Sequence, residues 1–110
     1  MPFKIEHKTS VTASLTATNS ASTSARIPWS ANAGGMVFVT AVDSGATTIT
    51  WYAASDPEAP PVPVIDGGNN VTTTIASGRA YYIPDSLFAA PFIMPVTNAG
   101  TATLTVSAKG

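Results

Sequence analysis

The segment TATLTVSAK, residues 101–109, alternates apolar and hydroxyl-bearing side chains. Its apolar members are Ala102, Leu104, Val106 and Ala108, each with a threonine or serine before it. Successive side chains of a β-strand point to opposite faces, so this segment has one face for a core and one for solvent. Threonine is β-branched and suits the solvated face of a strand. The segment therefore predicts a half-buried antiparallel strand.

The same two-residue period recurs in two other segments. It runs through SVTASLTAT (10–18) and through TTITWYA (47–53). In the second of these, Trp51 shares a face with Ile49 and Ala53, and we therefore expect Trp51 in the core. Shorter strand candidates are FKIEHK (3–8), VPVI (62–65), VTTTI (71–75), AYYI (80–83) and PFIMPV (91–96).

Turn-forming residues separate these segments at short intervals. The breakers are NAGG (32–35), DSG (43–45), DPEAPP (56–61), DGGNN (66–70), SG (77–78) and NAG (98–100). Glycine and asparagine allow positive φ in tight turns, and proline fixes φ in connectors. About eight short strands with this spacing predict an all-β fold, an antiparallel β-sandwich or jelly roll, formed by residues 10–110 as a single domain. Residues 1–9 are expected to form an arm or an edge strand.

Two further segments predict less regular structure. MVFVTAV (36–42) is almost continuously apolar and β-branched, which predicts a central strand covered on both faces. DPEAPPVPV (56–64) is rich in proline, which predicts an extended connector or an edge strand.

The bulkiest part of the chain is SGRAYYIPDSLFAAPFIMP, residues 77–95. We expect Tyr81 and Ile83 on one strand face and Tyr82 on the other. The proline at position 84 ends that strand, and the aspartate after it is placed to cap at most one short helical turn near residues 85–89. Leu87 and Phe88 would then close an open end of the sandwich.

Charged residues make up 10% of the chain, well below the roughly 25% that is typical of soluble domains. The formal net charge is −1, and the five basic residues are scattered. Binding to nucleic acid requires several cations on one face, so nucleic acid is not an expected partner. No stretch approaches the roughly 20 apolar residues of a spanning helix, so a membrane is not an expected partner either. A nearly uncharged surface instead favours association with other proteins.

Residues that catalyse reactions or bind metals are few and dispersed. His7 is the only histidine, and the chain has no cysteine to pair with it. All four aspartates, Asp43, Asp56, Asp66 and Asp85, adjoin turn residues, where aspartate ordinarily bonds to nearby backbone amides. DGGNN (66–70) lacks the alternating ligands of a calcium loop and predicts a hairpin turn. We expect no enzyme, no metal site and no cofactor, and a hydrolase with paired carboxylates remains an open alternative.

Three aromatic residues are expected at the surface. Trp29 follows a proline in a polar loop, Tyr52 lies on the hydroxyl-bearing face of its segment, and Tyr82 points away from the face of Tyr81. A set of exposed aromatic rings favours a carbohydrate- or host-surface-binding module as one hypothesis. The same three residues, with Phe3 and Ile5 of the amino-terminal segment, are also candidates for contacts in a protein assembly.

The carboxy-terminal part contains an ordered set of short motifs. A G-R-A-Y-x-I-P strand leads to a D-x-L-F turn, then to a P-F-I strand and a G-x-A-T-x-T-V-x-x-K-G ending. The matching positions are Gly78, Arg79, Ala80, Tyr81, Ile83, Pro84, Asp85, Leu87, Phe88, Phe92, Ile93 and 100–110. Together with the preceding TITWYAASDPEAPPVPVIDGG, this pattern covers residues 47–110 and resembles small structural proteins of tailed bacteriophages.

The resemblance implies a component of the virion, most simply a head decoration or cement protein. Such a protein would bind the major capsid protein, or other virion proteins, on the surface of the phage head after synthesis in the host cytoplasm. It would also be expected to form a homo-oligomer. The resemblance brings no catalytic motif, and a neck, tail or fibre protein would fit the same residues.

Overall fold

The computed structural model describes residues 10–29, 34–87 and 89–109, which form strands and one short 3-10 turn. The elements are β1 (Ser10–Ala17), β2 (Ile27–Pro28), β3 (Gly34–Asp43), β4 (Thr48–Ala54), β5 (Val62–Pro63), β6 (Ile65–Asp66), β7 (Asn69–Asn70), β8 (Thr72–Thr74), β9 (Arg79–Tyr82), η1 (Asp85–Leu87), β10 (Phe92–Thr97) and β11 (Thr101–Lys109). The all-β prediction is confirmed, and the 3-10 turn lies in the segment where a single helical turn was expected.

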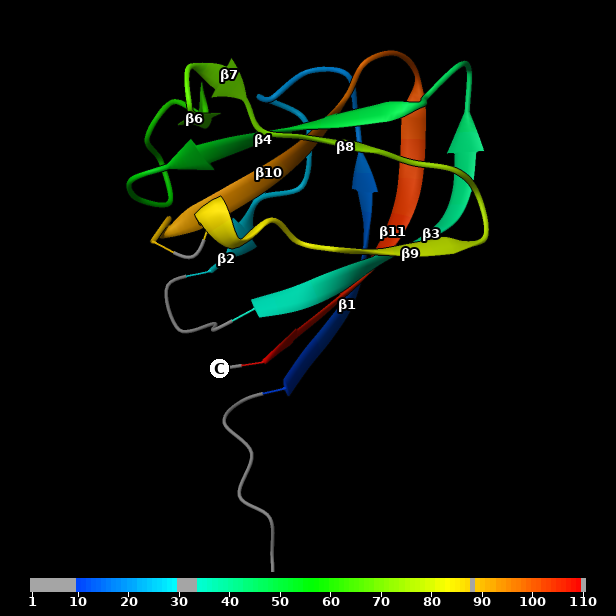
Figure 1. Cartoon of the computed structure of the whole chain (residues 1–110), viewed down its shortest axis with the longest axis horizontal. Helices are drawn as coiled ribbons and strands as arrows, with labels where there is room; N and C mark the ends of the chain where they lie inside the picture. Colours follow the sequence, from blue (N-terminus) through cyan, green and yellow to red (C-terminus); the bar gives the residue numbers. More distant parts are fainter. Residues whose placement is uncertain (1–9, 30–33, 88, 110) are drawn as a thin grey trace, which may run out of the picture.

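The strands form two main sheets and one small hairpin (Figure 1). Sheet A has the order β1-β11-β3-β9. Sheet B has the order β2-β10-β4, and both β5 and β8 pair with the remaining edge of β4. The interrupted stretch from β5 to β8 can be counted as one strand, so that the described chain has eight strands. Numbered 1 to 8 along the chain, these have the order 1-8-3-6 in sheet A and 2-7-4-5 in sheet B. This is the strand order of a jelly roll, in which one long hairpin is wound into two facing sheets.

The predicted alternation is confirmed in β11, which is the strand between β1 and β3. Leu104 lies opposite Leu15 of β1 and Val39 of β3, so an apolar row crosses three strands of sheet A. Leu104 is fully buried, whereas the neighbouring Thr103 is exposed. A shift in register between these two residues bends the ladder with β3. The period of two in the sequence thus sets which face of sheet A meets the core.

Both sheets contribute to one cluster of buried side chains. Its largest member from sheet B is Trp51, as expected, and its indole Nε1 donates a hydrogen bond to Thr73 Oγ1 at 3.0 Å. The polar atom of this buried ring is therefore satisfied within the sheet. Other members include Val37, Leu104 and Val106 from sheet A, and Ile49 and Ile93 from sheet B.

One end of the sandwich is closed by the η1 turn. Leu87 is 1% exposed and belongs to the core cluster, as expected. Its N–H donates to the carbonyl of Pro84, and its own carbonyl accepts from the N–H of Ala90. The preceding strand also follows the prediction, since Ile83 is buried and Tyr82 is exposed. The predicted role of Phe88 falls outside the described residues.

The DGGNN segment forms the hairpin turn that was expected. Gly67 and Gly68 have φ values of 61° and 85° between β6 and β7, which is the sign that a two-residue hairpin turn requires. At the base of this hairpin, Val64 N–H donates to Trp51 O, and Val71 N–H donates to Val64 O. The proline-rich segment before it contributes only β5 to the edge of sheet B, in agreement with its prediction.

The prediction that residues 36–42 are covered on both faces is wrong. Val37 and Val39 are buried, but Phe38 is 42% exposed and Thr40 is exposed. The strand is central within sheet A, yet the described chain places only one other sheet against it, and that sheet covers the inner face alone. An almost unbroken run of apolar residues was taken to mean burial on both faces. One of the two apolar faces is in fact open.

Replacing Arg26 with alanine is expected to loosen the 55–61 loop. The guanidinium donates to three carbonyl oxygens, those of Asp56 at 3.0 Å, Pro57 at 2.6 Å and Ala59 at 3.0 Å. Because the group is partly exposed, we expect a loss of only about 1 kcal/mol in global stability. Amide exchange in the loop should become faster, and lysine should not restore protection because it lacks the planar fork. Unchanged exchange in the alanine variant would contradict this role.

Candidate binding surface

The outer face of sheet A is divided between apolar and hydroxyl-bearing side chains. The register places Tyr82 of β9 beside Met36 of β3, and Met36 beside Ser107 of β11. In the next row, Ala80 lies beside Phe38, which lies beside Thr105. The β9 and β3 half of this face is therefore apolar. We call Met36, Phe38, Ala80 and Tyr82 the apolar strip.

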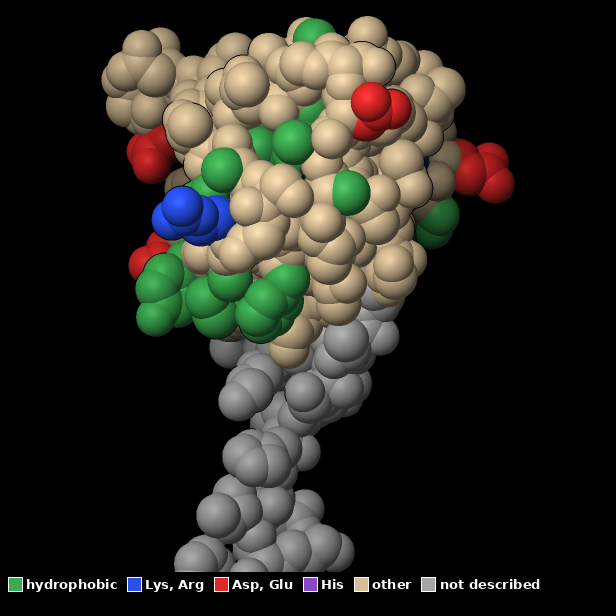
Figure 2. All heavy atoms as spheres, turned by 90° about the vertical axis from the view of Figure 1, so that its right-hand side faces the viewer, with side chains coloured by type: hydrophobic (Ala, Val, Ile, Leu, Met, Phe, Trp, Pro, Cys, Tyr) green, Lys and Arg blue, Asp and Glu red, His purple; other side chains and the backbone are tan. Residues whose placement is uncertain are grey.

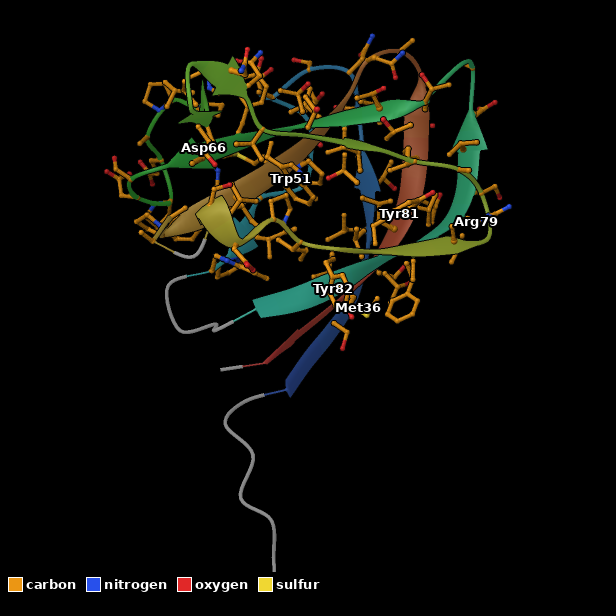
Figure 3. All side chains as sticks on the ribbon, in the orientation of Figure 1. Met36, Trp51, Asp66, Arg79, Tyr81 and Tyr82 are labelled. Carbon is orange, nitrogen blue, oxygen red and sulfur yellow. The ribbon has the colours of Figure 1, made fainter. Side chains whose placement is uncertain are left out.

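The apolar strip is open to solvent. Tyr82 is 79% exposed and Phe38 is 42% exposed, the largest rings among the exposed hydrophobic residues of the described chain. Figure 3 shows Met36 and Tyr82 together on one side of the sheet and Tyr81 on the opposite side. In Figure 2 hydrophobic side chains gather on the lower part of the described surface, just below a basic side chain. An exposed apolar cluster of this kind is typical of a protein-binding site.

A groove runs along the strip and has a volume of about 970 Å³. Gly34 and Gly35 lie where β3 begins, and a Cβ added at Gly34 would meet nothing within 4 Å. The lack of side chains there leaves the groove open at that end. Its charged member is Asp85, at the start of η1. The described lining residues are Gly34, Gly35, Met36, Phe38, Tyr82, Ile83, Pro84, Asp85 and Ser107.

The structure separates the aromatic residues that were expected at the surface. Tyr82 is highly exposed, whereas Tyr52 is half-buried on β4, opposite Met94 and Pro63 in sheet B. The expectation of an exposed Trp29 is wrong, because this side chain is 1% exposed and lies in the core cluster. Its segment is held inward by the pairing of β2 with β10 and by the bond from Trp29 N–H to Pro91 O at 2.8 Å. Phe3 and Ile5 lie outside the described residues.

Sequence reasoning missed two members of the strip. Met36 and Phe38 were assigned to a strand buried on both faces. They alternate with the buried Val37 and Val39, and so they share the outward face with Thr40. The signal that could have revealed them is Thr40, which continues their face as a polar residue in an otherwise apolar run. Val62 and Ile65 were also missed as exposed apolar residues, at 59% and 57%.

The described acidic residues occupy turns and strand ends. Asp56 Oδ1 accepts the backbone N–H of Glu58 at 2.9 Å, which is the turn function that the sequence predicts. Asp43 ends β3, Asp66 ends β6 and Asp85 begins η1. Within the described part of the chain, no three histidine, cysteine, aspartate or glutamate residues are grouped so that they could hold a metal ion. His7 lies outside that part.

Among the residues that the structure describes, no helix has the length and apolar character needed to cross a membrane. Comparison of this chain with protein-family models, with curated proteins and with solved structures finds no match.

Proposed function

We propose that this chain is a noncatalytic structural protein of a tailed-phage virion, which decorates the head by binding the lattice of the major capsid protein. The observation that carries the proposal is the exposed apolar strip with its groove on the outer face of sheet A. A rigid sandwich that leaves two large rings open to solvent on one side is suited to pack against another protein.

The chemistry of the surrounding surface supports the same proposal. Thr103 and Ser14 are exposed on the hydroxyl-bearing half of this face, and Thr105 and Ser107 are half-buried there. Burying a hydroxyl group costs less free energy than burying a charged group, because a buried charge requires a partner. A neighbour could therefore cover the whole face at moderate cost. In a lattice, many such contacts of moderate strength sum to firm retention.

The resemblance to phage structural proteins also bears on this surface. The G-R-A-Y-x-I-P motif spans β9, and Ala80 in this motif belongs to the apolar strip. The variable position of the same motif is Tyr82, which is 79% exposed. A variable residue at the centre of a contact surface is the place where specificity for one particular capsid would arise.

The carbohydrate-binding alternative relied on Trp29, Tyr52 and Tyr82 acting as one platform. These residues lie in the core, in sheet B and on the outer face of sheet A, so the platform does not form. We therefore do not propose a sugar site.

Replacing Phe38 and Tyr82 together with serine is expected to weaken binding to purified capsids by about 30-fold, or about 2 kcal/mol. The melting temperature should change little, because both side chains point to solvent. Val62→Ser is a matched control, since Val62 is comparably exposed but lies on β5 at the edge of sheet B. Co-sedimentation with capsids measures the binding.

Two results would count against the proposal. Quantitative mass spectrometry of virions assembled from the encoding genome should find copies of this chain in fixed proportion to the major capsid protein, and their absence would defeat the virion assignment. Equal binding by the serine variant and the Val62→Ser control would instead show that the apolar strip is not the contact surface.

A further inference from the structure

β9 has an open edge in the described part of sheet A. It is the last strand of that sheet, and it pairs with β3 alone. The N–H of Ile83 donates to Gly35 O at 3.0 Å, so this residue pair is a hydrogen-bonded one. Bonded and non-bonded pairs alternate along an antiparallel ladder. The backbone N–H and C=O groups of Tyr81 therefore point to β3, while those of Ala80 and Tyr82 point to the open edge.

The opposite edge of sheet A is less accessible. There the carbonyl oxygen of Thr16 in β1 accepts a hydrogen bond from the N–H of Ala25, at 3.4 Å, so the following loop covers one end of the strand. No described element covers β9 in this way. Open backbone donors and acceptors on a sheet edge are a template for pairing with another strand.

We infer that two copies of this chain pair through β9 about a two-fold axis. In the register that this edge allows, Ala80 of each copy lies opposite Tyr82 of the other copy, and Tyr81 lies at the axis. Ala80 and Tyr82 are both residues with outward backbone groups, so each such pair exchanges two hydrogen bonds. Pro84 has no N–H, which ends the bonded stretch at Tyr82 and fixes this register.

The side chains are complementary in the same register. On the outer face a small residue, Ala80, meets a large one, Tyr82 of the second copy. The Tyr82 ring is 79% exposed and lies beside Met36 in the single chain, and it would gain Ala80 of the second copy as a neighbour on its other side. The two apolar strips would become one continuous surface on a joined sheet of eight strands, twice the four of sheet A.

Charge is complementary as well. Arg79 and Asp85 are both exposed. Arg79 is the first residue of β9 (Figure 3), and Asp85 begins η1 just beyond the other end of this strand. Antiparallel pairing brings the arginine end of one copy to the aspartate end of the other, and it does so twice because of the two-fold symmetry. A second copy of this chain therefore supplies partners both for the open backbone groups of β9 and for the charges at its ends. A two-fold contact of this kind closes on itself and does not propagate into a fibre.

This inference stands apart from the virion assignment, because it concerns the pairing of purified chains with one another. The chain has no cysteine, so introduced thiols report on single contacts. Ala80→Cys and Tyr82→Cys chains are mixed under mild oxidation. Paired residues on a bonded position have Cα atoms about 5.5 Å apart, within disulfide range, whereas the diagonal Ala80–Ala80 and Tyr82–Tyr82 separations of about 7–8 Å fall outside it.

The expected result is a disulfide dimer that forms in the mixture and is much less abundant with either variant alone. Ser14→Cys, on the same outer face but on β1 at the opposite edge, is the matched control in place of one partner. Equal cross-linking with this control would overturn the inference. So would sedimentation of the unmodified chain as a monomer up to millimolar concentration.

Two further variants test the pairing without thiols. Ala80→Pro removes an outward N–H that β3 does not use, and proline is tolerated at such an edge position, so the fold should persist while dimerisation weakens at least tenfold. If this variant fails to fold, the charge change Arg79→Asp should weaken dimerisation and the double change Arg79→Asp with Asp85→Arg should restore it. A double variant that pairs no better than Arg79→Asp alone would contradict the proposed register.

Discussion

Replacing Gly100 with alanine is expected to lower the free energy of unfolding by roughly 3 kcal/mol. Gly100 lies between β10 and β11 with φ of 61°, a left-handed conformation that costs other residues about 1–2 kcal/mol. A Cβ at this position would also collide with the carbonyl oxygen of Asp43 and approach Ser44 Cβ to 2.7 Å. Crowding of this kind adds about 1–3 kcal/mol. Chemical denaturation of the two proteins measures the difference.

The effect is large because two connections between the sheets touch at this glycine. The β3–β4 turn and the β10–β11 turn each carry the chain from one sheet to the other. Asn98 joins the second turn to the start of β4, since its Oδ1 accepts from the N–H groups of Thr47 at 2.9 Å and Thr48 at 3.0 Å. A displaced Gly100 would therefore disturb both connections at once.

Gly67→Ala is the matched control. Gly67 has the same φ of 61°, but a Cβ there would meet nothing within 4 Å. The control should lose only the conformational part, about 1–2 kcal/mol. The difference between the two variants then measures the close approach of the two turns. Equal losses would show that the turns are not in contact as the structure has them.

The features of this fold that could be predicted from sequence are those that depend on local pattern. Alternation in residues 101–109 predicts β11 and its buried face, because both follow from the geometry of a single strand. The pair Gly67 and Gly68 predicts the hairpin turn, because few other residues adopt its backbone conformation. Asp85 after a proline predicts the short helical turn for a similarly local reason.

The candidate surface could be predicted only in part. The outward direction of Tyr82 follows from alternation with Tyr81 and Ile83, so that residue was found. Phe38 was not, because β3 is apolar on both faces and only the layering of the two sheets decides which face is covered. The interruption between β5 and β8 was predicted from the DGGNN turn, but not that both pieces pair with the same edge of β4, since that depends on the fold of the whole sheet.

Replacing Trp29 with alanine is expected to cost about 3–5 kcal/mol in the free energy of unfolding. In a chain of this size such a loss lowers the melting temperature by roughly 15 °C or more. If Trp29 were exposed in a polar loop, its replacement would change the melting temperature very little. The structure leads to the opposite expectation, because the indole is 1% exposed within a core that both sheets form. Thermal unfolding followed by circular dichroism distinguishes the two.

The control is Tyr82→Ala, which removes a ring of similar size that is 79% exposed. It should leave the melting temperature nearly unchanged while weakening every association that uses the apolar strip. Trp29→Phe should lie between, since phenylalanine refills most of the cavity. This ranking of the three variants tests the fold, because no pattern in the sequence around Trp29 explains why its side chain is buried. Pairing of β2 with β10 brings it inward across a long separation in sequence, so a small loss in Trp29→Ala would mean that this pairing does not hold the edge of sheet B closed.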